Sequence, residues 1–161
     1  MAVFTAIEDK LAGKTKMKMS ANEMTPCVKS NDETPEYFFA EGCFITELLN
    51  SNDDPNVSIA RARVEPGKTT RWHYLQGTGE RYVVLEGAGL VEIDDLQAQQ
   101  VNAGDVVVIP PQARQRITNI GADDLIFLAI CSPRFTEAVY VDIEDSTADI
   151  SRRTGSGENN G

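Results

Sequence analysis

The stretch from Gly67 to Asn119 decides the fold, and it reads GKTTRWHYLQGTGERYVVLEGAGLVEIDDLQAQQVNAGDVVVIPPQARQRITN. Its first half carries the only histidine of the chain, His73, and a glutamate a few residues later, Glu80. Its second half carries a run of β-branched residues that ends at a proline pair. Short β-branched and aromatic runs bounded by glycine, proline and aspartate are typical of strands joined by tight turns.

Comparable runs lie on both sides of this stretch. We predict strands over residues 36–40, 43–49, 57–64, 69–75, 80–85, 89–93, 97–101, 106–109, 115–120, 125–131 and 138–143. A hairpin-like turn is predicted at Glu41 and Gly42, and another turn at Asp94 and Asp95. Many short strands at regular spacing, separated by turn residues, indicate an all-β sandwich or barrel.

The two ends of the chain differ in composition from this central part. Residues 1–34 are polar, with runs rich in Lys and in Asn, Ser and Asp, and we predict an N-terminal arm with one short helix near residues 6–11. Residues 146–161 are rich in Ser, Gly, Asn and Arg, and we predict a flexible tail. The predicted barrel domain therefore covers residues 35–145.

Charge, hydropathy and cysteine content limit the possible partners and the compartment. The formal net charge of −10 disfavours nucleic acid and anionic membranes as partners. No apolar run reaches the roughly 20 residues of a membrane span, and the N-terminus does not have the pattern of a signal peptide. Cys27, Cys43 and Cys131 are odd in number and irregularly spaced, which argues against a disulfide framework. We therefore expect a cytoplasmic protein that binds neither nucleic acid nor membrane.

Arginine replaces lysine as the main basic residue inside the barrel segment. Between residues 58 and 119 seven basic side chains balance seven acidic ones, and all the basic residues except Lys68 are arginines. Arginine suits bidentate pairing with carboxylate or phosphate. Two interpretations stay open: arginine–glutamate pairs on the surface of a sheet, which we favour slightly, or the binding of an anionic substrate.

The two halves of the deciding stretch resemble the two sequence motifs of the cupin superfamily. The residues on matching positions are Gly67, His73, Glu80, Gly87, Gly104, Pro110 and Asn119. The sequence departs from the motifs at three positions, where Leu75 replaces a histidine, Gln112 a glycine and Gln115 a histidine. The resemblance implies a double-stranded β-helix, the small jelly-roll barrel of cupins. The segment from Glu80 to Gly87 looks similar to the sugar-phosphate-isomerase-like branch.

Alternation along the strands predicts which side chains point into such a barrel. Arg71, His73 and Leu75 should share the inner face of one strand, and Trp72 and Tyr74 its outer face. Likewise, the next strand should point Glu80, Tyr82 and Val84 inward, and the strand of the second motif should point Gln115, Ile117 and Asn119 inward with Arg114 and Arg116 outward.

The inward polar side chains allow two kinds of site. In the first, His73, Glu80 and Gln115 bind a divalent ion such as Zn, Ni, Mn or Fe, weakly because only one nitrogen ligand is present. In the second, no metal is bound and His73 hydrogen-bonds Glu80. In the cupin motif that this sequence resembles, the position of His73 is that of a metal ligand. We therefore weigh the metal site and the metal-free site about equally.

An imidazole–carboxylate couple of His73 and Glu80 would be able to move a proton at a carbon beside a carbonyl group, since the carboxylate raises the pKa of the histidine. Tyr82 is a candidate donor to the oxyanion, although a core aromatic is the simpler interpretation. Arg71 is a candidate for holding an anionic substrate group, and Gln115 for a sugar hydroxyl.

Three functions follow as hypotheses. The first is an isomerase that acts on a sugar or sugar phosphate, with His73, Glu80 and Tyr82 as catalytic residues. The second is a carbohydrate-binding protein without catalysis, and the third is a metal-dependent oxygenase, which the single histidine disfavours. We also expect a homodimer, because a small barrel leaves strand edges to cover and residues 36–49 supply additional strands.

Overall fold

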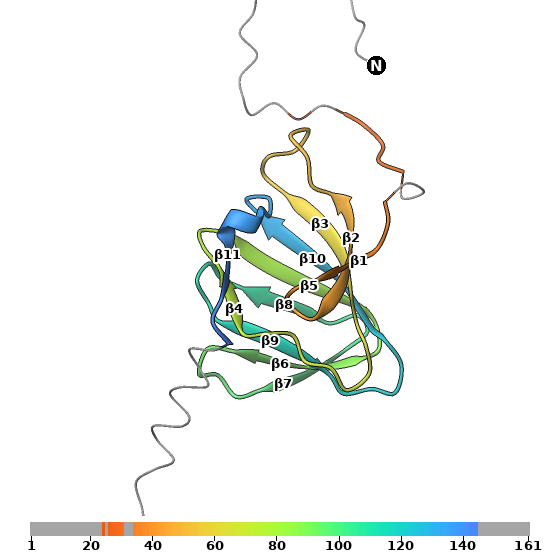
Figure 1. The fold of residues 1–161 in the computed structure, drawn as a ribbon, viewed down its shortest axis with the longest axis vertical. Coiled ribbons are helices and arrows are strands. Elements are labelled where there is room, and N and C mark those ends of the chain that lie inside the picture. Colours follow the sequence, from red (N-terminus) through yellow and green to blue (C-terminus); the bar gives the residue numbers. More distant parts are fainter. Residues whose placement is uncertain (1–23, 25, 31–33, 145–161) are drawn as a thin grey trace, which may run out of the picture.

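Two antiparallel sheets face each other and form a flattened barrel in the computed structural model, which describes residues 24, 26–30 and 34–144 (Figure 1). One sheet has the strand order β1 (Tyr37–Phe39), β2 (Cys43–Leu49), β3 (Ser58–Val64), β10 (Leu125–Ser132), β5 (Gly79–Glu86) and β8 (Val106–Ile109). The other has the order β11 (Tyr140–Asp142), β4 (His73–Leu75), β9 (Gln115–Asn119), β6 (Ala88–Ile93) and β7 (Gln99–Asn102). A short 3-10 helix, η1 (Glu137–Val139), precedes β11. The prediction of an all-β barrel is confirmed.

Alternation of burial along β9 and the middle of β5 builds much of the core. On β9 the residues Gln115, Ile117 and Asn119 are buried, and on β5 the residues Glu80, Tyr82 and Val84 are buried. These two inward-facing sets were predicted from the period of two, and they are confirmed. The apolar members pack with Val64, Leu125, Phe127 and others between the sheets, so the polar members are held in a close-packed surrounding.

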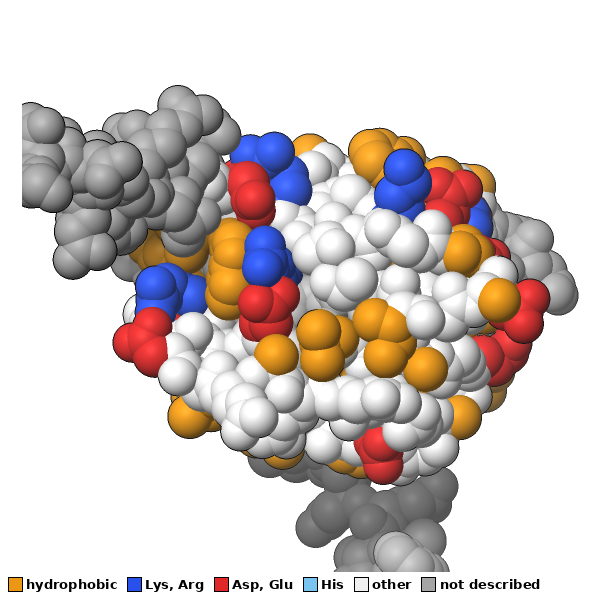
Figure 2. All heavy atoms as spheres, turned by 90° about the horizontal axis from the view of Figure 1, so that it is seen from below, with side chains coloured by type: hydrophobic (Ala, Val, Ile, Leu, Met, Phe, Trp, Pro, Cys, Tyr) orange, Lys and Arg blue, Asp and Glu red, His pale blue; other side chains and the backbone are white. Residues whose placement is uncertain are grey.

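The arginines of the barrel lie mainly in ion pairs on its outer surface. On the face shown in Figure 2, Lys or Arg side chains lie beside Asp or Glu side chains, around a short row of hydrophobic ones. Arg116 pairs with Glu92 at 2.6 Å and its guanidinium lies over the ring of Trp72. The outward orientation predicted for Arg116 and Trp72 is therefore confirmed.

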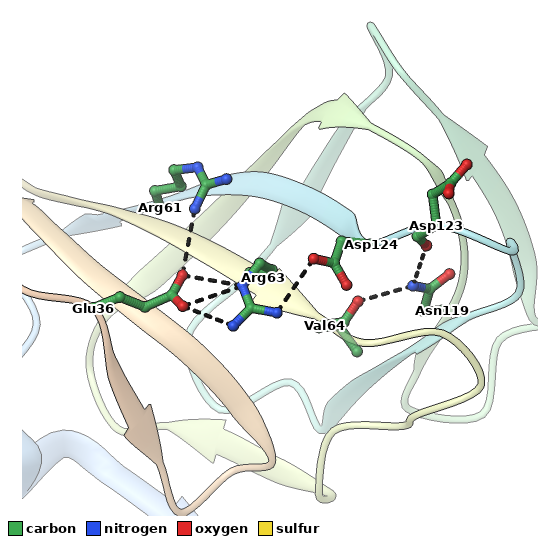
Figure 3. A network of polar contacts seen from close by, with 7 residues as sticks. All are labelled: Glu36, Arg61, Arg63, Val64, Asn119, Asp123 and Asp124. Carbon is green, nitrogen blue, oxygen red and sulfur yellow. Dashed lines mark hydrogen bonds and ion pairs between the residues drawn. The ribbon is translucent and has the colours of Figure 1, made fainter.

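A second outer network joins strands that are distant in sequence (Figure 3). Arg63 binds Glu36 through Nη2 at 2.7 Å and Asp124 through Nη1 at 3.2 Å, and Arg61 reaches the same Glu36. In the same view the amide of Asn119 donates to the carbonyl oxygens of Val64 and of Asp123. The first of the two interpretations of the arginines, pairing on the sheet surface, describes these contacts.

Strand β4 is shorter than the predicted 69–75. Only His73–Leu75 pair as a strand, while Thr69 forms an isolated bridge to Thr118. The side chain of Thr70 accepts a hydrogen bond from the backbone N–H of Ile117, and the backbone N–H of Arg71 bonds the carbonyl of Glu41 instead of a strand partner. Because of these contacts, the backbone of residues 69–71 does not form the regular hydrogen bonds of a strand.

Two predictions fall on parts of the chain that the structure does not describe. The helix near residues 6–11 and the tail 146–161 lie outside the described residues. Among the residues that are described, no helix has the length and apolar character needed to cross a membrane.

Candidate active site

A pocket opens at one end of the barrel, over the inner face of the six-stranded sheet. Its volume is about 590 Å³ when the space open to solvent at its mouth is included. Most of the wall is apolar or aromatic and comes from β1, β2, β3 and β10. The carboxyl groups on the wall belong to Glu41, Glu47 and Glu80.

Glu80 enters this pocket at the end of a buried hydrogen-bonded chain. The hydroxyl of Tyr82 donates to Oε1 of Gln115 at 2.8 Å, and Nε2 of Gln115 donates to Oε2 of Glu80 at 2.7 Å. The thiol of Cys131 approaches the other oxygen, Oε1 of Glu80, at 3.6 Å. Both ends of the Gln115 amide are thus occupied, and the orientation of Glu80 is fixed.

His73 lies behind the wall of the pocket and is only 1% exposed. Its Nδ1 is 2.9 Å from the carbonyl oxygen of Arg71, which makes Nδ1 the protonated nitrogen of the neutral ring and leaves Nε2 directed toward Glu41, 3.8 Å away. The ring stacks on Tyr140 with a centroid distance of 5.0 Å. The strand register also places His73 opposite Gln115.

The expected rise in the pKa of His73 is wrong. Burial lowers the pKa of this imidazole, and the opposing effect of Glu80 is smaller. The structure also shows no hydrogen bond between His73 and Glu80 among the described residues; the carboxylate that approaches Nε2 is that of Glu41. His73 is therefore neutral near pH 7 and contributes a dipole instead of a charge.

Glu41 is the site residue that sequence reasoning missed. It belongs to the turn between β1 and β2, and the strand pattern predicted only that turn. Burial, with a contribution from Asp142, raises the pKa of Glu41 to about 8. Burial and the nearby Glu41 raise the pKa of Glu80 to about 7, despite the Gln115 hydrogen bond that lowers it. Two buried carboxyl groups with raised pKa values thus line one pocket.

Arg71 and Tyr82 do not lie where their proposed roles require. The guanidinium of Arg71 pairs with Asp142 at the surface, with both side chains 38% exposed, so the predicted inward orientation of Arg71 is wrong. The interruption of the strand before His73 explains the difference, because alternation does not hold outside a regular strand. Tyr82 is 3% exposed, packs on Phe127 and donates a hydrogen bond to Gln115, as a core aromatic does.

The predicted metal ligands do not fit a divalent ion. Gln115 turns its NH₂ group toward Glu80, and its oxygen, the only ligand atom of the amide, accepts from Tyr82. Leu75, buried beside His73, offers no ligand atom. In the described part of the chain no group of three or more His, Cys, Asp and Glu side chains is arranged to hold a metal ion.

The thiols beside the carboxyl groups are not activated. Burial raises the pKa of Cys43 and of Cys131 well above the ordinary value, and neighbouring carboxylates add to the effect. A reactive cysteine needs the opposite surrounding. Cys43 and Cys131 therefore serve as buried packing residues.

Comparison with known proteins gives matches over the barrel. Residues 60–131 match the Cupin domain family. An uncharacterized protein of Methanocaldococcus jannaschii is 35% identical over 107 residues, which are 65% of this chain and 85% of that protein.

Solved structures share the architecture at low sequence identity. Pac13, a nucleoside dehydratase from Streptomyces, has a TM-score of 0.63 and 20% identity, over 74% of this chain and 92% of its own. KdgF from Halomonas has a TM-score of 0.62 and 18% identity, over 71% of this chain and 99% of its own. Likeness at this level of identity shows a common fold.

Proposed function

This chain belongs to the cupin superfamily, and we propose that it is a small enzyme of that superfamily that moves a proton at a carbon beside a carbonyl group without a metal ion. One observation supports this most: Glu41 and Glu80 line one pocket, where burial raises the pKa of both carboxyl groups, to about 8 and to about 7. Near neutral pH the first is a carboxylic acid and the second is partly a carboxylate, which are the two forms that acid–base catalysis needs.

The reaction that this pair supports best is aldose–ketose isomerisation. The Glu80 carboxylate removes the proton from the carbon next to the carbonyl, while the Glu41 carboxylic acid gives its proton to the carbonyl oxygen, and an enediol forms. The Glu41 carboxylate then removes the proton of the neighbouring hydroxyl, and Glu80 returns its proton to the former carbonyl carbon. Atoms and charges balance, and both side chains end in their starting forms.

The roles of the other site residues change accordingly. Gln115 and Tyr82 are positioning residues that hold Glu80 through the hydrogen-bonded chain. His73 is a positioning residue for Glu41, which its Nε2 faces. Among the described residues no Lys or Arg lines the pocket, so a carbohydrate without a phosphate group suits it better than a sugar phosphate.

Proton exchange with solvent tests this function. The protein is incubated in D₂O with aldoses and ketoses of three to six carbons, and NMR follows deuterium at the carbon beside the carbonyl and the formation of the isomer. We expect exchange with the parent and its loss, by about a hundredfold or more, in Glu80→Gln and in Glu41→Gln. Glu86→Gln, an exposed change on the same strand as Glu80, is the matched control and should retain the activity.

Carbohydrate binding without catalysis is the second candidate. The aromatic side chains on the wall favour it, because they offer apolar area to a sugar ring. Saturable binding of a sugar with no deuterium exchange in the parent would support this candidate and contradict the first.

A further inference from the structure

In the part of the chain that the structure describes, the side chains that line the pocket include acidic ones and no basic one. The acidic ones are Glu41, Glu47 and Glu80. In a pocket with low-dielectric walls, this one-sided arrangement attracts positive charge and repels anions.

Of the three carboxyl groups on the wall, that of Glu47 is the most available to a ligand. It is half-buried on β2, and its two hydrogen bonds come from neutral donors, the hydroxyl of Tyr37 at 3.4 Å and Nδ2 of Asn50 at 3.3 Å. Both donors bind Oε1, and within the described residues no ion pair involves Glu47. Its charge is thus available to a ligand.

The nearby basic side chains have other partners. Arg61 and Arg63 are bound to Glu36 on the outer side of the sheet (Figure 3), and Arg71 is bound to Asp142. Arg134 donates to the amide oxygen of Asn50, which lines the pocket, and to that of Asn52. None of these guanidinium groups is on the pocket wall.

Aromatic rings line the same pocket as Glu47. Tyr37, Phe39 and Phe135 line the same pocket, with Phe39 and Phe135 in an edge-to-face pair at 6.2 Å. A cation near the faces of aromatic rings is attracted by their π electrons, and a carboxylate beside the rings adds to the attraction.

We propose that the ligand of this pocket carries a protonated amino group, which Glu47 binds among these rings. This inference rests on the proposed function, and it narrows the substrate to a hydroxylated carbonyl compound with an amine, in the chemical class of the amino sugars. Glu41 and Glu80 act on the carbonyl end, and Glu47 fixes the amine end.

Four sugars that differ mainly in charge test the proposal: glucosamine, N-acetylglucosamine, glucose and glucuronate. Isothermal titration in a mildly acidic buffer should show glucosamine binding about tenfold more tightly than the two neutral sugars, because the charged hydrogen bond to Glu47 adds about 1.4 kcal/mol. Glucuronate should bind most weakly.

The variant Glu47→Gln should remove the preference for glucosamine over glucose while leaving glucose binding within about twofold. Glutamine keeps the oxygen that Tyr37 and Asn50 bind, so the fold should be retained, and thermal melting checks this. The control Glu86→Gln removes one negative charge from the exposed end of β5 and should keep the preference.

Several results would overturn the proposal: equal affinity for glucosamine and glucose, a preference that survives in Glu47→Gln, tightest binding of glucuronate, or no binding of any of the four sugars. The deuterium-exchange assay distinguishes a failure of the proposed reaction from a failure of this proposal. A preference for glucosamine without deuterium exchange supports the charge selection and rejects the catalysis.

Discussion

Gln115 shows how one side chain decides the electrostatics of the site. Its amide donates to Glu80 and cannot take up a proton, so the partner of Glu80 stays neutral at every pH. A histidine in that position would bring a positive charge and lower the pKa of the carboxyl group. Here burial and the nearby Glu41 raise the pKa of Glu80 instead. The residue that replaces the imidazole therefore leaves Glu80 able to act as the proposed base near neutral pH.

The pH profile of deuterium exchange should follow these two carboxyl groups. Glu80 must lose its proton to act as the base, so the rate should rise with pH through about 7. Glu41 must keep its proton to act as the acid, so the rate should fall as the pH passes about 8. We expect a narrow bell-shaped profile of kcat/KM with its maximum between these values. A profile that rises steadily to about pH 10 would contradict the role of Glu41.

At the scale of the elements, the turn between β1 and β2 delivers Glu41 to the pocket. Gly42 adopts φ +100° there, and the carbonyl of Glu41 accepts a hydrogen bond from the backbone N–H of Arg71. The alternation of side chains between the two faces of a strand depends only on neighbouring residues. It therefore predicted the inward faces of β5 and β9. It could not predict the position of Glu41, which depends on a contact with a segment far along the chain.

Two glycines of the motif segments allow a matched test of backbone packing. Gly87 has φ +83°, and a Cβ added there would lie 2.8 Å from the carbonyl oxygen of Asp124. Gly104 has φ +94°, but nothing lies within 4 Å of its added Cβ. Gly104→Ala should lower the unfolding free energy by about 1–2 kcal/mol, because alanine is strained at positive φ. Gly87→Ala should lower it by about 1–3 kcal/mol more, because the added Cβ also clashes with the carbonyl oxygen of Asp124. Urea unfolding measures both, and equal losses would contradict the expected clash.

At the scale of the whole molecule, β1 is an edge strand with exposed aromatic side chains. Tyr37 is 42% and Phe38 62% exposed on it. Exposed edges favour pairing with another chain, and we expect a homodimer joined through β1. Light scattering at micromolar concentration should give twice the 17.6 kDa of the chain.

The variant Phe38→Glu should then yield the monomer, because a charge would be buried at the contact. Val108→Glu, at an exposed position of the opposite edge strand β8, is the matched control and should leave the dimer intact. A monomeric mass for the parent, or dissociation by the control alone, would contradict an interface at β1.

The two buried carboxyl groups also make folding a reaction that consumes protons. A glutamate has an ordinary pKa of 4.5, whereas the native values are about 8 for Glu41 and about 7 for Glu80. Between these limits the native state holds protons that the unfolded chain releases. Their contribution to stability is fully present below about pH 4.5 and is lost as the pH rises through about 7 and then about 8.

Urea unfolding of the parent and of Glu41→Gln at about pH 6 and about pH 9 measures this coupling. The parent should lose more unfolding free energy between the two conditions than the variant does, by about 1 kcal/mol or more. The same loss in both proteins would contradict the coupling. In a weakly buffered solution near neutral pH, denaturing the parent should acidify the medium, and denaturing the variant should acidify it less.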